Sequence, residues 1–198
     1  MTLEKPWSKE FDELLRKLES SWGGKIKRPG GKRAEQDPRF AASDFFFYPT
    51  YYGEIEDFKI SVNIGEIGGG DLPMLAGADN VEFLNIRVYV NNDYRIKMSH
   101  EGKVDKFKKL FGLSEDTPTG NKRLDKKYVL KTASDRDKSL LKSMEFQEHI
   151  QNLEPFSHFE ISKAQIIWLQ GLSDKSQLDF SNIEKNAKTL IEIAKIIG

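Results

Sequence analysis

A run of glycines is the part of this sequence whose residue types come closest to a recognisable chemistry. Gly68, Gly69 and Gly70 follow a segment with strand-like alternation, and a glycine-rich loop after a strand can surround a phosphate. A phosphate loop also needs a Lys-Ser/Thr pair or a helix that begins on the glycines. Here Asp71 follows, and its negative charge would repel an anion. We interpret 65–80 as a long inter-strand loop, with these four residues as candidate ligand contacts.

An aromatic block lies ahead of that loop. Six of the eight side chains of 45–52 are aromatic. Aromatic side chains fill cores and also stack on flat ligands. We expect the block to begin the core, and its tyrosines are further candidate ligand contacts: Tyr48, Tyr51 and Tyr52.

The three histidines, His100, His149 and His158, do not stand at the spacing of a metal motif. A strand would place His158 and Glu160 on one face, and His149 could approach from a preceding helix. A zinc site needs three or four ligands that neighbouring groups hold in position. We therefore predict no metal and no cofactor, and we interpret the histidines as surface and helix-end residues.

No other pattern of polar residues predicts a reaction. The sequence lacks a G-x-S-x-G turn, no pair of acids stands out, and the absence of cysteine excludes disulfides, thiolate catalysis and zinc–thiolate sites. The catalytic residues are unknown from the sequence. We expect a non-catalytic module that binds a protein or a small ligand. The first alternative is a hydrolase or transferase with a pocket near 65–80.

Charge is sorted into blocks along the chain. Residues 23–40 carry six bases and two acids, 44–82 eight acids and one base, and 103–131 nine bases and four acids. Because the blocks cancel to a net charge of zero, we expect them to pair within the protein and to support self-association. Nucleic-acid binding through the basic arm and 103–131 is the second alternative. An isoelectric point near 6.9 weighs against it.

The composition is that of a globular protein. The chain has 198 residues, of which 38% are hydrophobic and 31% charged. It shows neither the start of a signal peptide nor a run of 18 apolar residues, so we expect a cytoplasmic protein without a membrane span.

The clearest expected element is an amphipathic helix over 1–22, followed by a basic Gly/Pro tether over 23–40 and a single α+β domain over 41–198. The helix places six large apolar residues within one arc: Trp7, Phe11, Leu14, Leu15, Leu18 and Trp22. On a tether, such a helix could dock on its own core or on a second copy. We predict association of two chains through these residues.

Hydrophobic periodicity predicts the remaining elements. Strands are expected over 58–64, 84–90, 94–98, 124–132, 159–161 and 164–169, and helices over 104–111, after Ser134 and after Ser181. The helix after Ser134 has two apolar faces, so we expect it either to be buried on both sides or to break near Ser143. Asn91, Asn92 and Asp93 predict a tight hairpin between the second and third strands. The order favours an α+β fold, a mostly antiparallel sheet with helices packed on one face.

One segment carries a resemblance. The pattern G-N-x-x-x-D-x-x-Y-V-L, made of Gly120, Asn121, Asp125, Tyr128, Val129 and Leu130, precedes a helix capped by Ser134. Together with the strand meander it resembles bacterial and archaeal α+β domains of unknown function, over about three quarters of the chain. Leu124 stands where such domains have Phe. Some of them carry membrane spans ahead of the domain, and the resemblance implies no activity.

Overall fold

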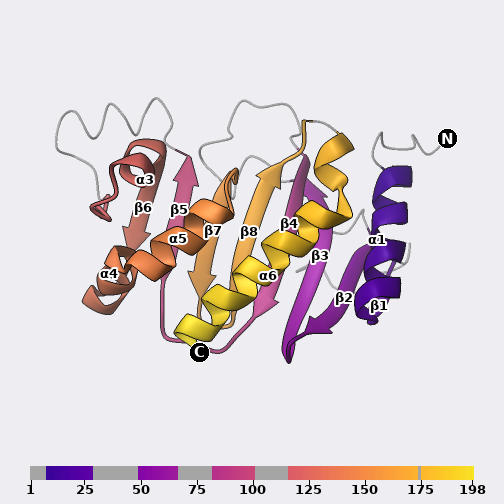
Figure 1. Ribbon diagram of the computed structural model, residues 1–198, viewed down its shortest axis with the longest axis horizontal. Coiled ribbons are helices and arrows are strands. Elements are labelled where there is room, and N and C mark those ends of the chain that lie inside the picture. The colour runs from indigo at the N-terminus through magenta and orange to yellow at the C-terminus, as the bar shows by residue number, and fades with distance from the viewer. Residues whose placement is uncertain (1–7, 29–48, 67–81, 101–115, 174) are drawn as a thin grey trace, which may run out of the picture. The chain divides into compact units, whose positions relative to one another are not determined.

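The computed structural model describes residues 8–28, 49–66, 82–100, 116–173 and 175–198 (Figure 1). Helices are interspersed with strands whose recorded pairings are antiparallel, which confirms the predicted α+β class. The chain forms two compact units. The first unit comprises 1–86 and 171–185, and the second comprises 87–170 and 186–198.

The strands of the first unit follow the order of the sequence. They are β1 (Lys25–Lys27), β2 (Thr50–Ile55), β3 (Phe58–Glu66) and β4 (Glu82–Tyr89), with the end of β4 in the second unit. The turn between β2 and β3 places Glu56 and Asp57 at positive φ, which short polar turns tolerate. The expected strands 58–64 and 84–90 are confirmed as β3 and β4. Part of the segment expected as a tether is a strand, because β1 pairs with β2.

Helix α1 (Ser8–Trp22) packs within the first unit. Phe11, Leu14, Leu15 and Leu18 are each at most 2% exposed. The Tyr51 hydroxyl donates to the Gly23 carbonyl oxygen at 2.9 Å, and the Trp22 and Tyr51 rings lie 6.2 Å apart. The helix therefore docks on its own chain. Association of two chains through its apolar residues remains a prediction that would require exchange of the helix, and Trp7 lies outside the described residues.

The strands of the second unit follow the order β8 (Gln165–Gly171), β7 (His158–Ser162), β5 (Ile96–His100) and β6 (Tyr128–Thr132), and β8 ends in the first unit at Gly171. The register aligns Met98 with Leu130 on one side and with Phe159 on the other, so these side chains share a face. Helix α5 (Met144–Asn152) crosses β5 and β7 on this face, where Phe146 meets Phe159 (Figure 1). This face carries the core of the second unit.

The predicted hairpin between the second and third strands is wrong. β5 pairs with β6 and β7 instead of β4. The Asn92 side chain donates to the Ser162 carbonyl oxygen at 2.8 Å and accepts from the Tyr94 backbone N–H, so it ties the turn to the β7–β8 connection. The Asn-rich segment therefore changes the direction of the chain without forming a hairpin, because the Asn92 side-chain amide bonds a residue that is distant in the sequence.

The other predicted elements fall close to those observed. The expected strand 124–132 begins as helix α3 (Lys122–Lys127), because the Asn121 side chain caps it, and becomes β6 at Tyr128. Ser134 caps α4 (Asp135–Lys142), and the helix breaks at Ser143 as predicted before α5 begins. The last helix, α6 (Phe180–Ile197), follows a short 3-10 turn, η3 (Lys175–Leu178), and begins one residue before Ser181. The expected helix over 104–111 lies outside the described residues.

Candidate functional site

The predicted ligand contacts do not form a described site. Gly68, Gly69, Gly70, Asp71 and Tyr48 lie outside the described residues, and so does the pocket expected at 65–80. Within the described part, the Tyr51 side chain is fully buried and its hydroxyl holds the end of α1. Tyr52 is half-buried, with the Lys27 amine 4.9 Å from its ring centroid.

His158 and Glu160 lie on one face of β7, as predicted, but His158 is buried in the sheet, so its interpretation as a surface histidine is wrong. The His158 Nε2 atom is 3.2 Å from a Glu160 carboxylate oxygen, and Lys97 on β5 bonds the same carboxylate at 3.1 Å. His149 belongs to α5, which covers the opposite face, so the structure does not bring it to His158. Within the described residues, no three His, Asp or Glu side chains gather as metal ligands.

A hollow of about 270 Å³ lies in the first unit between α1 and the start of α6. Glu10, Glu13 and Asp179 line it together with Lys17. A hydrogen bond from Ser181 is the main reason why the pKa of Asp179 lies below its ordinary value. Asp179 also accepts hydrogen bonds from the first backbone N–H groups of α6. It therefore caps the N-terminus of this helix.

The segment that carries the resemblance builds a rigid turn in the second unit. Gly120 has a φ of +84°, a conformation that favours glycine. The Asp125 carboxylate accepts from the backbone N–H and the hydroxyl of Thr119, at 2.8 and 2.7 Å, and from the Gly120 N–H. Asn121 caps α3 by accepting from the Arg123 N–H. This turn fixes where α3 begins and β6 follows.

Beside this turn lies a polar cluster around Glu154, whose side chain is only 6% exposed. Arg123 and Lys127 of α3 donate to its two carboxylate oxygens at 2.5 and 2.8 Å. The Tyr128 hydroxyl donates to Glu154 at 3.0 Å, and its ring stacks on Phe156 with centroids 4.4 Å apart. One carboxylate thus joins the loop after α5 to α3 and β6.

The surroundings of Glu154 favour its ionised form. Burial works to raise its pKa, but the bonds from Lys127 and Tyr128 and the charges of Lys127 and Arg123 outweigh burial and hold the pKa below its ordinary value. Burial raises the pKa of Tyr128, and the Glu154 charge raises it further. His100, whose ring lies 5.0 Å from that of Tyr128, has a lowered pKa because of burial and the Lys127 charge.

Asp137 is a second carboxylate whose two oxygens both accept hydrogen bonds, and it is only 1% exposed. It accepts from the backbone N–H groups of Ala133 and Ser134 at 3.0 and 2.9 Å, and from that of Arg95 at 3.0 Å. The Ser134 hydroxyl oxygen in turn accepts from the Asp137 N–H, which completes a capping box at the start of α4. These contacts fix α4 next to the end of β6.

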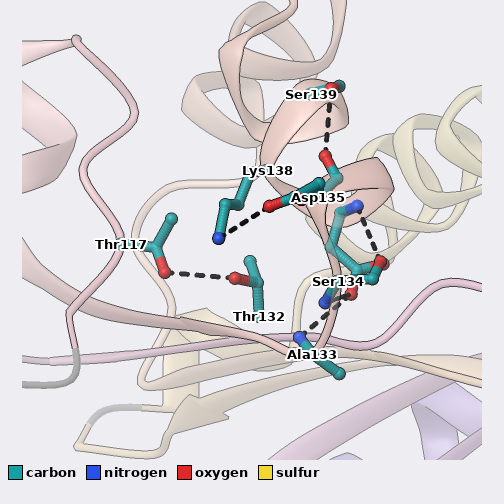
Figure 2. A network of polar contacts seen from close by, with 8 residues as sticks. Thr117, Thr132, Ala133, Ser134, Asp135, Lys138 and Ser139 are labelled. Atoms are coloured by element: carbon teal, nitrogen blue, oxygen red, sulfur yellow. Dashed lines mark hydrogen bonds and ion pairs between the residues drawn. The ribbon is translucent and has the colours of Figure 1, made fainter.

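The outer edge of β6, the terminal strand in the order, is occupied by Asp116–Thr117, which we name the edge segment. Asp116 accepts from the Leu130 N–H at 2.7 Å, and the Thr117 N–H donates to the Leu130 carbonyl oxygen at 2.9 Å. Figure 2 shows a third contact, 3.1 Å between the Thr117 and Thr132 hydroxyls, close to the start of α4. The edge is therefore covered by an acid and one peptide group of the same chain.

Exposed bases lie around this edge. We name the set the basic flank: Lys122, Arg123 and Lys126 of α3 and Lys131 of β6. Glu154 neutralises part of this charge, because it pairs with Arg123 and with the neighbouring Lys127. Lys122 and Lys126 are exposed and have no recorded ion pair in the described part of the chain, so they leave a positively charged surface beside the Glu154 cluster.

Sequence reasoning missed the key members of this site. Neither Glu154 nor Asp116 stands in a motif, and each finds its partners only through the fold. The one sequence signal for this site was the basic composition of 103–131, the segment that contains the bases involved.

Among the helices of the described ranges, none combines the length and the apolar character needed to cross a bilayer. No family model matches the chain, and no curated protein matches it. Among solved structures, the crystal structure of the mycobacterial trehalose monomycolate transport factor A, TtfA, is similar to it. The TM-score is 0.56 at 8% identity, and the similarity covers 98% of this chain and 95% of that chain. At this identity the two proteins share a fold.

Proposed function

We propose that this chain is a non-catalytic module that binds an acidic surface of a partner protein through the basic flank. The observation that carries the proposal is the bonding of Glu154. Both oxygens of this nearly buried carboxylate accept hydrogen bonds from α3 and β6, so Glu154 braces the basic flank. A braced surface loses little conformational freedom on binding, which favours affinity.

A half-buried and a buried carboxylate of the second unit support the same role. Asp125 and Asp137 bond backbone N–H groups of turns and helix starts, which is structural work. The structural neighbour is named a transport factor, a name that describes part of a transport process. We propose a non-catalytic binding role for this chain, with which that name is compatible.

Photocrosslinking in the cells that produce the protein tests the proposal. A photoreactive amino acid placed at Lys126 should give a discrete protein adduct, and the same group at Lys163, an exposed base in the β7–β8 turn, should not. Lys122→Glu should lower the adduct yield at 126, whereas Lys142→Glu on α4 should leave it unchanged. Both residues are exposed, so neither change disturbs the core.

Two results would contradict the proposal. An adduct with nucleic acid at 126 would support the nucleic-acid alternative instead. Equal labelling at 126 and 163 would show that the basic flank has no preferred partner.

A further inference from the structure

We propose that the outer edge of β6 receives an extended acidic segment of a partner protein, which displaces the edge segment and pairs with β6 as an added strand. The inference rests on the proposed function, because the segment would bind at the same basic flank. It adds the mode of recognition, which is strand addition.

The direction of the backbone groups identifies the edge. In a β-strand, the N–H and C=O of one residue point to the same side, and the side alternates along the chain. Both groups of Leu130 bond the edge segment, so Leu130 faces outward. Thr132 then faces outward too, while Val129 and Lys131 face β5. Tyr128 faces outward as well, but its N–H already donates to the Leu124 carbonyl oxygen, so a partner strand would meet Leu130 and Thr132.

The edge segment covers only a short part of this edge. Within the described ranges, its contacts with β6 include one backbone bond, one carboxylate bond and one hydroxyl contact. By the same alternation, the next N–H to face β6 would be that of Thr119. It donates to the Asp125 carboxylate instead, so backbone pairing does not continue past Thr117. Proteins commonly cover edge strands to prevent unwanted pairing, and a short cover is one that a longer strand can replace.

Charge selects an acidic occupant. The edge segment itself satisfies the Leu130 N–H with a carboxylate, and Lys126 and Lys131 of the basic flank lie on either side along the chain. The outward Leu130 carbonyl oxygen needs an N–H donor, which a peptide offers and a phosphodiester does not. An acidic peptide therefore fits both the charges and the hydrogen-bonding groups.

Peptide binding to the full chain tests the inference. The probe is a fluorescein-labelled peptide amide with the sequence of 114–119, Ser-Glu-Asp-Thr-Pro-Thr, followed by anisotropy. Asp116→Ala removes the carboxylate bond of the edge segment, and it should bind the probe about fivefold more tightly than the unchanged chain does. Thr117→Val, which removes only the hydroxyl contact, should shift the affinity in the same direction by less.

A modified probe and a further variant test whether the peptide pairs with β6 as an added strand. A probe methylated on the backbone nitrogen of its first Thr cannot donate to Leu130 and should bind at least about tenfold more weakly. Lys126→Glu in the Asp116→Ala chain should also weaken binding. Circular dichroism verifies that each variant is folded.

The inference is overturned if the unchanged chain and both variants bind the probe equally, or if the methylated probe binds as well as the parent. It is also overturned if light scattering shows a dimer that Asp116→Ala abolishes, since the occupant would then be a second copy. A protein adduct at 126 without probe binding would refute strand addition and leave the proposed function intact. Probe binding without such an adduct would support the edge and refute the proposed function.

Discussion

Glu154 links the loop after α5 to α3 and the adjoining β6, which lie 26 to 31 residues earlier in the sequence, and its energetic role can be measured. Its carboxylate bonds Arg123, Lys127 and Tyr128 while its side chain is 6% exposed. Burying a charge is costly unless partners compensate, and here the partners outweigh burial and lower the pKa. Arg123 is 66% exposed, so solvent weakens its share of the stabilisation.

Glu154→Gln should lower the free energy of unfolding by about 1–2 kcal/mol at pH 7, measured by urea denaturation. The folded-state pKa lies below the ordinary 4.5, so the stabilisation is complete above that value and is lost as pH falls through the folded-state pKa. The difference between variant and parent should therefore shrink over that range. Glu148→Gln, an exposed change on α5, is the control. A difference independent of pH would contradict this account.

The pKa of His100 depends on the charges of the same cluster. Its pKa is lowered first by burial and then by the Lys127 charge. Lys127→Gln should raise the pKa of His100, read from imidazole resonances in an NMR titration, and Lys126→Gln should change it less. A His100 pKa that does not respond to Lys127→Gln would show that the two groups do not interact in solution.

Helices and strands were predictable from the sequence where residues close together in the chain determine them. The strands β3, β4, β7 and β8 and the break at Ser143 follow from periodicity and capping residues that act within a few positions. The pairing of β5 did not follow, because Asn92 bonds Ser162, 70 residues away. The helical start of the segment 122–127 depends on Asn121 and Asp125, whose bonds become visible only in the folded turn.

Docking of α1 on its own chain makes a prediction at this scale. Leu15 is fully buried, so Leu15→Ala should lower the free energy of unfolding by about 2–5 kcal/mol. Arg16→Ala, next to it and exposed, should change it by less than about 0.5 kcal/mol. Thermal and urea unfolding of both variants provide the comparison. A Leu15→Ala chain as stable as the Arg16→Ala chain would show that α1 does not pack against its own unit in solution.

For the molecule as a whole, the blocks of charge anticipated part of the candidate site. Ion pairs form within each unit, as Arg28 with Asp12, Lys97 with Glu160 and Lys127 with Glu154. None of these three pairs joins two of the blocks, so the pairing between blocks stays a prediction. The sequence could indicate that 103–131 is basic. It could not indicate which acids neutralise it or that Asp116 lies on a strand edge, because these facts depend on register and on contacts between distant segments.

Amide hydrogen exchange at Leu130 tests most directly the central claim, that an acidic segment covers a separately exposable edge. The Leu130 N–H is bonded only through the Asp116 carboxylate, whereas Val129 and Lys131 face β5. We predict that Asp116→Ala speeds exchange at Leu130 by about tenfold or more and leaves Val129 and Lys131 unchanged. Exchange at Leu130 that does not change, or that rises together with both neighbours, would contradict the account.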